Sequence, residues 1–490
     1  MNEDKCNNLK DDDKIKLANK LKISINNTKN ICKLIIKKHN ILYPCDNIIS
    51  SETSIHFKKH QLEVSNHLSK SNGIIVYHQV GTWKTLTAIS SSQCLLNTKI
   101  VNKIIVITPT SLQENFKEQL LKYNIDIDFT KYYFYTIQKI VNDIINKTVI
   151  SCNNSLVIID EAHNLRTLEG SRFKIIHEYC KNATKILLLT ATPFINYTFD
   201  IINLVSLIKK EQPLTIDEFK NIKKDNKKLK EYLKDTFSLY FKNSDDINFP
   251  NKEIIDIYLK MSPEYLKIYN KIEKGEESKI LFFKDKNIKV FYNGVRRVSN
   301  NINKLSPKNE WIINKILENK KSKFLIFSHF IDMGITPLMK LLDEYKINYL
   351  SVTGDLSIKE RKNATDKYNN GDINILFISK AGAEGLNLKN TTFIILLEPS
   401  WNENEVEQII GRGIRYKSHQ SLNIIQRKVI VYKLYLIKPI EYDNLTKILD
   451  NTLLEWNDNI LSIDLYLKNY SKLKQQDINS FYNLIHKYRL

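Results

Sequence analysis

The segment Val157-Ile158-Ile159-Asp160-Glu161-Ala162-His163 constrains the fold and chemistry of this chain more than any other. Three apolar residues followed by two carboxylates predict a buried strand that ends at the carboxyl edge of a parallel sheet. That edge is where α/β folds bind their ligands. There one of the two carboxylates can hold Mg²⁺ through water, and the other can orient an attacking water. Taken alone, the segment is also compatible with an ordinary solvated loop.

A second segment has the pattern of a phosphate-binding loop. Ile74–Tyr77 is predicted to be a strand and Leu86–Ser90 a helix, so the residues between them form the strand–loop–helix arrangement whose backbone N–H groups converge on phosphates. Lys84 would reach the β- and γ-phosphates, and the Thr85 hydroxyl would ligate Mg²⁺. The nucleotide-binding residues predicted here are Gly81, Thr82, Lys84 and Thr85.

Trp83 departs from the pattern of such a loop. Glycine is expected immediately before the lysine, because it allows close backbone approach and unusual backbone angles. Tryptophan places a bulky side chain beside the phosphates, which puts hydrolysis in doubt but not the fold. A plain strand-to-helix turn is the alternative interpretation, and the Lys84-Thr85 pair argues against it.

Length and composition limit the class of protein. A chain of 490 residues exceeds one usual core and predicts two or three domains. The formal net charge of +20 favours a polyanionic partner such as nucleic acid. The abundance of Asn, Lys, Ile and Tyr is also what an AT-rich genome encodes, so part of the basic excess can reflect composition. No apolar run reaches 18 residues, so no membrane span is expected, and the N-terminus lacks a hydrophobic signal core.

The cysteine pattern gives no sign of a metal or redox motif. No two of the six cysteines form a C-x-x-C pair, so neither a zinc site nor a redox dithiol is predicted. We therefore expect a soluble protein in a reducing, intracellular setting. The cysteines are Cys6, Cys32, Cys45, Cys94, Cys152 and Cys180.

The order of apolar runs along the chain predicts two α/β domains, each a doubly wound parallel sheet. Predicted strands of the first are Gly73–Tyr77, Lys103–Thr108, Tyr132–Tyr135, Leu156–Ile159 and Lys185–Thr190. Predicted strands of the second are Lys323–Ser328, Asn348–Val352, Ile373–Ile378, Thr392–Leu397 and Val429–Leu436.

Three further segments flank or separate these domains. The predicted organisation is a polar extension over 1–50, a first domain over 51–208, a Lys-rich helical insertion over 209–300, a second domain over 301–436 and a helical tail over 437–490. Helices are predicted at Lys14–Ser24 and Thr28–His39 within the extension. The lysines of the insertion could contact a phosphate backbone, although a solvated helix face explains them equally well.

Further polar residues of the first domain follow or precede its strands. Gln61 lies about one helix before the phosphate loop and could read an adenine edge by a bidentate hydrogen bond. Thr110 and Ser111 follow a strand and could contact a nucleic-acid phosphate, or cap a helix, or both. Thr190 and Thr192 end another strand and could couple the first site to the second domain.

The second domain adds glycines and arginines. Gly382 and Gly385 follow a strand and allow close backbone approach to a ligand. Gln408, Arg412 and Arg415 are predicted to share one face of a helix, at spacings of four and three. Two such arginines can stabilise charge on a γ-phosphate during its transfer. A salt-bridged surface helix is the plainer interpretation of this segment alone.

Together these segments resemble the superfamily 2 helicase-like ATPases with two RecA-like lobes, and within them the Snf2-related branch. The chain is similar to the helicases and nucleoside triphosphatase I of large cytoplasmic DNA viruses. The resemblance covers about residues 55–435. It is carried by Gly81-Thr82-Trp83-Lys84-Thr85, Asp160-Glu161-Ala162-His163, Thr190-Ala191-Thr192-Pro193, Gln408 to Arg415, His60-Gln61-Leu62, Thr108 to Leu112, Phe327 to Phe330, Gly385 to Leu388 and Pro399 to Asn402.

The resemblance implies that ATP with Mg²⁺ binds between the lobes and that hydrolysis drives movement along nucleic acid, with DNA favoured over RNA. Arg415 is the preferred arginine finger. The resemblance also suggests a role together with the viral transcription machinery, in the host cytoplasm or the virion. Oligomeric state is left open. A catalytically weakened nucleic-acid-binding subunit, suggested by Trp83, is the alternative function. A nuclease has no support, because no paired-carboxylate-plus-lysine motif lies outside the lobes.

Overall fold

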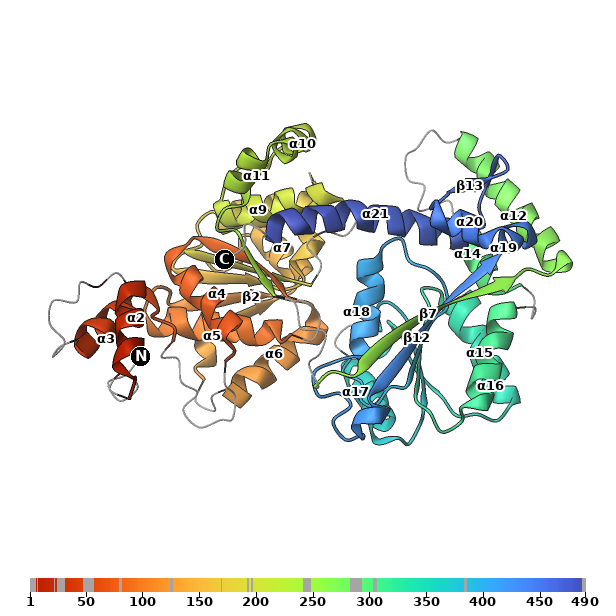
Figure 1. Ribbon diagram of the computed structural model, residues 1–490, viewed down its shortest axis with the longest axis horizontal. Coiled ribbons are helices and arrows are strands. Elements are labelled where there is room, and N and C mark those ends of the chain that lie inside the picture. The colour runs from red at the N-terminus through yellow and green to blue at the C-terminus, as the bar shows by residue number, and fades with distance from the viewer. Residues whose placement is uncertain are drawn as a thin grey trace. The chain divides into compact units, whose positions relative to one another are not determined.

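The computed structural model describes residues 6, 8–21, 23, 31–46, 57–78, 82–123, 127–168, 170–191, 194, 197–240, 248–282, 293–302, 306–382 and 386–486. The chain divides into two compact units. Unit 1 comprises Met1–Phe241 with Phe481–Leu490, and unit 2 comprises Lys242–Ser480. Within the described residues each unit contains one six-stranded parallel sheet (Figure 1), which confirms the predicted fold class.

The sheet of unit 1 has the strand order β3-β2-β4-β5-β1-β6. Every pair of neighbours is parallel, so the carboxyl ends of all its strands lie at one edge. The central strands are almost wholly apolar and buried, as expected for a sheet covered on both faces. The strands are β1 Gly73–His78, β2 Lys103–Ile107, β3 Tyr132–Tyr135, β4 Ser155–Ile159, β5 Lys185–Thr190 and β6 Phe237–Tyr240.

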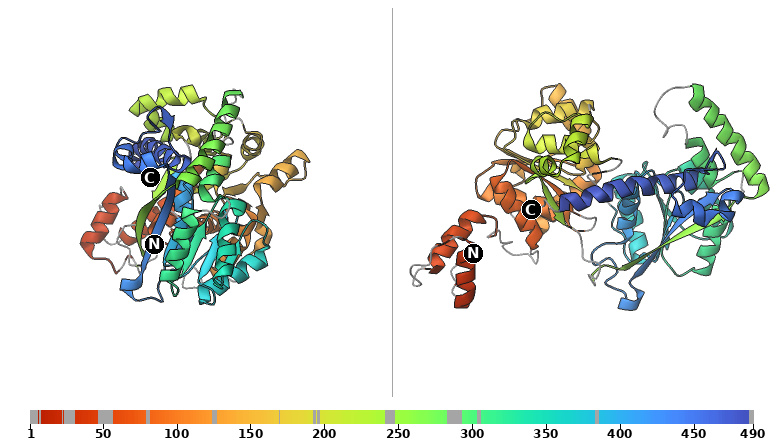
Figure 2. Two further views of the ribbon diagram at one scale, coloured as in Figure 1. Left: turned by 90° about the vertical axis from the view of Figure 1, so that its right-hand side faces the viewer. Right: turned by 45° about the horizontal axis from the view of Figure 1, so that its top comes forward.

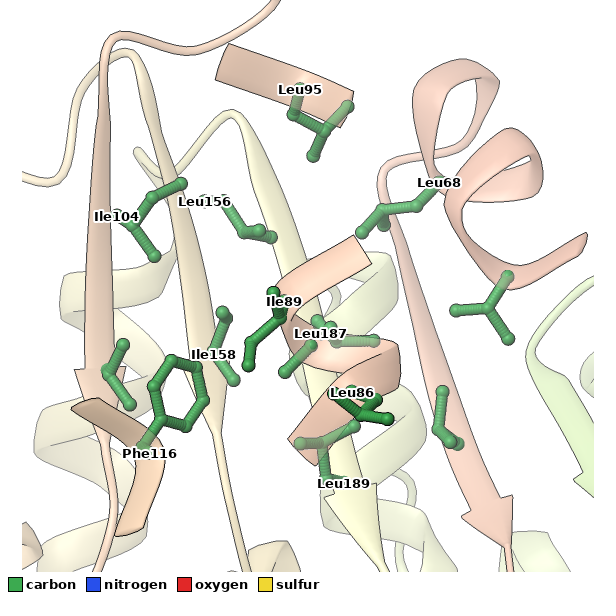
Figure 3. Close-up of a cluster of buried hydrophobic side chains, with 14 of the residues drawn as sticks. Leu68, Leu86, Ile89, Leu95, Ile104, Phe116, Leu156, Ile158, Leu187 and Leu189 are labelled. Atoms are coloured by element: carbon green, nitrogen blue, oxygen red, sulfur yellow. The ribbon is translucent and has the colours of Figure 1, made fainter. Parts of the chain in front are cut away.

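Helices cover both faces of this sheet. Side chains of α4, α5 and α6 form one apolar layer with alternate strand residues, and Figure 3 shows Ile89 and Phe116 in this layer beside Ile158. On the opposite face α9 contacts β1 and β5. The helices are α4 Lys59–Lys70, α5 Lys84–Asn97, α6 Thr110–Tyr123, α7 Ile137–Ile145, α8 Ser171–Cys180, α9 Ile202–Lys209, α10 Ile216–Lys224 and α11 Asn226–Leu233.

The described residues between 6 and 46 form an N-terminal module of two helices, α2 Asp11–Lys20 and α3 Ile31–Leu42. The first helix begins and ends earlier than the predicted Lys14–Ser24, and the second begins and ends later than the predicted Thr28–His39. In Figures 1 and 2 these two helices (red) lie beside each other, outside the helix layers of the sheet.

Four of the six cysteines are paired, which contradicts the expectation of reduced cysteines. Cys6 is bonded to Cys32, and Cys45 is bonded to Cys94. Cys152 and Cys180 are free and buried. The sequence missed the two bridges because their partners lie 26 and 49 residues apart, and such separations carry no local signature.

The sheet of unit 2 has the strand order β7-β12-β11-β8-β10-β9, again with parallel neighbours. Strands β7 and β12 pair along their whole lengths, and Figure 2 shows them side by side. The strands are β7 Asn251–Lys260, β8 Phe324–Phe327, β9 Leu350–Val352, β10 Ile375–Ile378, β11 Phe393–Leu396 and β12 Lys428–Ile437.

This second sheet is also covered on both faces. Helices α17 and α18 pack on one face, and α15 and α16 pack on the other. The helices of unit 2 are α12 Pro263–Phe282, α14 Asn293–Asn300, α15 Pro307–Glu318, α16 Thr336–Glu344, α17 Ile358–Asn370, α18 Glu403–Gly413, α19 Pro439–Asp443 and α20 Leu445–Asp450. Helix α21, Ile463–His486, begins in unit 2, and its residues from Phe481 onward belong to unit 1.

Two strands lie in the segment 209–300, for which the sequence predicts only helices. Strand β6 pairs with β1, and β7 pairs with β12. Strand β7 is exposed over its first four residues and partly buried over the next five, where Ile255 and Ile257 pack against the core of the sheet. In the C-terminal segment, a short hairpin of β13 Glu455–Trp456 and β14 Asn459–Ile460 interrupts the predicted helices.

Across the part of the chain that the structure describes, no helix is both long and apolar enough to span a membrane.

Candidate functional site

The predicted phosphate loop connects β1 to α5, as the strand–loop–helix pattern requires. Gly81 lies outside the described residues, and Thr82 is buried. Lys84 and Thr85 are the first two residues of α5. The Lys84 ammonium donates a hydrogen bond to the His78 carbonyl oxygen at 3.2 Å. The Lys84 ammonium therefore lies beside the carboxyl end of β1.

His78 is a neighbour of Lys84 that sequence reasoning missed. Its Nε2 lies 3.1 Å from the Ser238 hydroxyl in the neighbouring strand β6. Burial, and then the charges of His60 and Lys84, hold the pKa of His78 well below its usual value. The imidazole is therefore neutral at physiological pH and adds no positive charge against Lys84. Its position at the end of an apolar strand was the available signal.

Trp83 adopts the backbone conformation that the missing glycine would adopt without strain. Its φ is 65° and its ψ is 48°, in the left-handed region. A side chain in that region costs roughly 1–2 kcal/mol. The side chain is 42% exposed, so burial of the indole does little to offset this cost. Position 83 thus keeps the left-handed backbone conformation despite the substitution.

Gln61 joins helix α4 to this loop. Its side chain is 1% exposed. The amide oxygen accepts from the Lys58 backbone N–H at 2.9 Å, and the amide nitrogen donates to the Trp83 carbonyl oxygen at 3.4 Å. An amide oxygen has a second lone pair and its nitrogen a second proton, so each end retains capacity for another partner.

Asp160 and Glu161 follow β4 at the carboxyl edge of the sheet, as predicted. One Asp160 oxygen accepts from the Thr108 hydroxyl at 3.3 Å, and the other accepts from the Glu161 backbone N–H at 3.0 Å. Burial, and then the charge of Glu161, raise the pKa of Asp160 to about 6, while the charge of Lys84 opposes this rise. Asp160 therefore lies where an added cation would be favourable.

Glu161 also has a left-handed backbone, with φ 50° and ψ 45°. Non-glycine residues in sparsely populated conformations cluster at functional sites. Here the conformation places the Glu161 carboxylate 3.3 Å from His163 Nδ1. The same nitrogen lies 3.4 Å from the Thr190 hydroxyl at the end of β5. Glu161, His163 and Thr190 thus form a continuous polar path across two strand ends.

Sequence reasoning gave no role to Thr108 or His163, although both lie in segments that it singled out. Of the other predicted residues, Thr110 is exposed at the first position of α6, at the edge where β2 ends. Ser111 lies in the same turn, and its side chain is outside the described set. Thr192 also lies outside the described residues. Of the predicted pair, only Thr190 is therefore placed near the carboxylates.

Gly382 of unit 2 is required by close packing. A Cβ atom there would come within 1.8 Å of the Val352 carbonyl oxygen, so no other residue fits without backbone movement. Its N–H donates to the Ser379 hydroxyl at 3.3 Å. Gly385 lies outside the described residues.

Gln408, Arg412 and Arg415 do not share one helical face, which corrects the sequence prediction. Helix α18 ends at Gly413, so Arg415 lies beyond it. Arg415 nevertheless folds back, and its Nε donates to the Gly411 carbonyl oxygen at 3.1 Å. Burial, and then the charge of Arg412, lower the pKa of Arg415 to about 9. Two neighbouring guanidinium groups in this setting favour an anionic ligand.

Exposed lysines line the hairpin of α10 and α11 in unit 1. Two of these lysines lie four residues apart on α10. Three more lie on α11 and directly after it, at spacings of three and four residues. The nearby acids Glu218 and Asp225 are engaged in capping the two helices. We call these residues the lysine stripe: Lys220, Lys224, Lys227, Lys230 and Lys234.

Two family models match the chain. The SNF2-related domain matches residues 57–321, and the helicase conserved C-terminal domain matches residues 307–417. Together they span residues 57–417, which include every residue of the candidate site and all strands of the two sheets except β12.

The chain is also similar to individual proteins. A protein of Acanthamoeba polyphaga mimivirus, named as a putative ATP-dependent RNA helicase, is 34% identical over 465 residues, covering 88% of this chain and 97% of the relative. Nucleoside triphosphatase I of Choristoneura biennis entomopoxvirus is 26% identical, covering 79% and 73%. The SWI2/SNF2 ATPase core of Sulfolobus solfataricus, solved with dsDNA, is 20% identical with a TM-score of 0.37, covering 88% and 97%.

Proposed function

This chain belongs to the SNF2-related family and is an ATP-dependent helicase or translocase of superfamily 2, and we propose that it moves along DNA by hydrolysing ATP at the carboxyl edge of β1 and β4. The observation that carries the proposal is the group of polar residues at this edge: Asp160, whose pKa is raised by burial against the opposing charge of Lys84, accepts from the Glu161 N–H, and Glu161 reaches Thr190 through His163. Service in viral transcription, which the resemblance to nucleoside triphosphatase I implies, is part of the proposal.

The residues of unit 1 fit a nucleotide with Mg²⁺. Backbone groups of Gly81 and Thr82 and the Lys84 ammonium would hold the phosphates. The Thr85 hydroxyl and the Asp160 carboxylate are hard oxygen donors that would hold Mg²⁺, and the raised pKa of Asp160 is what a nearby cation would lower. When bound, Mg²⁺ supplies charge neutralisation at the β- and γ-phosphates.

We propose that Glu161 accepts a proton from the attacking water. The water oxygen forms a bond to the γ-phosphorus, while the bond from that phosphorus to the bridging oxygen of ADP breaks. Lys84, with Arg412 and Arg415 of unit 2, would offset the charge that develops on the γ-phosphoryl oxygens. The contact of His163 with both Glu161 and Thr190 supports Thr190 as a coupling residue.

Other predicted residues keep binding roles in this proposal. The remaining donor and acceptor of the Gln61 amide would read the adenine edge. Thr110, Ser111 and the backbone beside Gly382 and Gly385 would contact the nucleic-acid phosphates. Gln408 would join the arginines of unit 2 near the γ-phosphate, with Thr192 assisting Thr190.

Whether the protein moves along DNA or RNA is tested by comparing ATP hydrolysis with duplex DNA, single-stranded DNA and RNA of the same length. We propose DNA because the SNF2-related resemblance implies it, whereas the name of the mimiviral relative refers to RNA. Stimulation should be greatest with DNA. Stimulation by RNA alone would contradict the preference for DNA but would be consistent with the proposed ATPase activity.

Trp83→Gly is expected to lower the KM for ATP. Glycine adopts the left-handed conformation without strain and allows the phosphates to approach the backbone closely. We expect kcat/KM to rise about ten-fold, which corresponds to about 1.4 kcal/mol. Steady-state hydrolysis at several ATP concentrations measures this change.

Trp83→Ala is the matched control, because it removes the indole and keeps the strained Cβ. Equal gains with alanine and glycine would assign the defect to bulk, and a gain with glycine alone would assign it to the backbone. No change in either variant would contradict the expectation that Trp83 hinders ATP binding.

The alternative function, a weakened binding subunit, rests on Trp83 alone and has no support in the family matches.

Charge reversal in the lysine stripe should weaken DNA binding, because the variant neutralises fewer phosphates. For Lys227→Glu with Lys230→Glu, the slope of log affinity against log salt should become shallower by about 1 for each phosphate that is no longer neutralised. Lys320→Glu with Lys321→Glu, at exposed positions of unit 2, changes the net charge equally and serves as the control. Identical salt slopes in the two variants would show that the stripe is only a solvated surface.

A further inference from the structure

A covalent bridge joins the N-terminal module to the helix that follows the phosphate loop. The Cα atoms of Cys45 and Cys94 are 5.2 Å apart, within the range that a disulfide requires. Cys94 lies in α5, the helix whose first residues are Lys84 and Thr85. Both cysteines are fully buried, at 0% exposure. The bridge therefore lies inside the interface and is not a surface link.

Polar contacts surround the bridge on the α4 side. The Cys45 backbone N–H donates to the Asn66 amide oxygen at 2.9 Å, and the Asn66 amide nitrogen donates to Asp46 at 2.7 Å. The Lys70 ammonium donates to the Leu42 carbonyl oxygen one turn further along α4. The end of the module is thus seated on α4, the helix that carries Gln61, and bonded to α5.

The module has a small core of its own. A module of this size buries too little apolar surface for stability without additional links. The second bridge, between Cys6 and Cys32, supplies an internal link. The buried residues of the core are Cys6, Ala18, Leu21, Ile31 and Ile35.

We propose that Cys45 and Cys94 are a thiol pair whose oxidation fastens the N-terminal module onto α4 and α5 and thereby holds Gln61 and Lys84 in their binding positions. The consequence for ATP rests on the roles proposed above for these two residues. The bridge itself rests only on the geometry of the cysteines and the contacts around them.

Bridge formation needs an oxidant, and a small-molecule or protein disulfide supplies it. One cysteine thiolate attacks the oxidant disulfide and releases one thiol, and the second cysteine then displaces the other thiol. The two cysteines lose two protons and two electrons in total, and the oxidant is reduced to two thiols. Because the bridge is buried, exchange with solvent reductants requires local opening of the interface.

Peptide mapping of the full chain tests the bridge directly. The protein is equilibrated with oxidised glutathione, its free thiols are alkylated, and it is digested without reduction. The oxidised sample should yield a linked peptide that contains Cys45 and Cys94. During timed exposure to dithiothreitol, the Cys6–Cys32 bridge should open first, because Cys32 is partly exposed whereas Cys45 and Cys94 are buried.

The effect of the Cys45–Cys94 bridge on stability and ATP binding is tested by comparing oxidised and reduced protein. Oxidation should raise the melting temperature by about 5 °C or more. It should also lower the KM for ATP about five-fold, the lower end of ordinary coupling between two sites. A double variant with Cys45→Ala and Cys94→Ala should have the KM of reduced wild type under both conditions, and its melting temperature should rise on oxidation by less than that of the wild type, because only the Cys6–Cys32 bridge forms. A variant with Cys6→Ala and Cys32→Ala should keep the redox response of the KM.

Absence of the linked peptide from the oxidised sample would overturn the proposal. So would a linked peptide whose reduction leaves both the melting temperature and the KM unchanged. A shift in melting temperature without any ATP hydrolysis in either state would preserve the fastening and remove the proposed roles of Gln61 and Lys84.

Discussion

Replacing Glu161 with glutamine is expected to reduce steady-state ATP hydrolysis by about 10²- to 10⁴-fold, the usual contribution of a general base. Glutamine has nearly the same shape as glutamate but accepts no proton at neutral pH. The left-handed backbone at position 161 and the neighbouring His163 remain as they are. Nucleotide affinity should therefore stay close to that of the wild type, and a fluorescent ATP analogue measures it alongside hydrolysis.

The matched control for this variant is Glu63→Gln, on the exposed face of α4. It makes the same chemical change at an exposed residue with no proposed role and should leave hydrolysis unaltered. Retention of more than about a tenth of wild-type activity in Glu161→Gln would exclude Glu161 as the base, because a base contributes at least about 10²-fold. Loss of ATP binding in the same variant would instead indicate a structural role.

Arg415→Ala is expected to lower kcat by about 10³-fold or more, the effect of removing an arginine finger. The variant should fold at least as stably as the wild type, because burial, and then the charge of Arg412, lower the pKa of Arg415 and so disfavour its charged form. Lysine at this position should not restore the rate, because it lacks the planar fork of donors. Single-turnover hydrolysis and thermal melting measure the two effects separately.

Arg412→Ala provides the comparison for this second prediction. If it lowers kcat far more than Arg415→Ala does, the finger is Arg412 and the preference for Arg415 is wrong. A loss of stability in Arg415→Ala would contradict the unfavourable charge at this position.

The sequence predicted some strands to the residue and missed others. Strands β3 and β5 have the bounds that the sequence predicted, because polar residues end each apolar run sharply. Strands β6 and β7 were missed, because one is short and the other is half-exposed in a Lys-rich segment. The resemblance to Snf2-related ATPases is confirmed by both family matches.

Parts of the candidate site could not be read from the sequence. The position of Asp160 and Glu161 follows from the parallel sheet, but the contact of His163 with Thr190 depends on the order of β4 and β5. Arg415 leaves the helix because α18 ends at Gly413, although the spacing of its arginines continues the helical pattern. The Cys45–Cys94 bridge joins distant segments and has no local signature.

The most direct test of the central claim is steady-state ATP hydrolysis by the full wild-type chain, with and without duplex DNA. Glu161→Gln, prepared in the same way, sets the background from contaminating ATPases. We predict hydrolysis well above that background, increased by DNA, despite Trp83. Wild-type hydrolysis equal to that of Glu161→Gln, both with and without DNA, would contradict an ATP-driven motor in this chain.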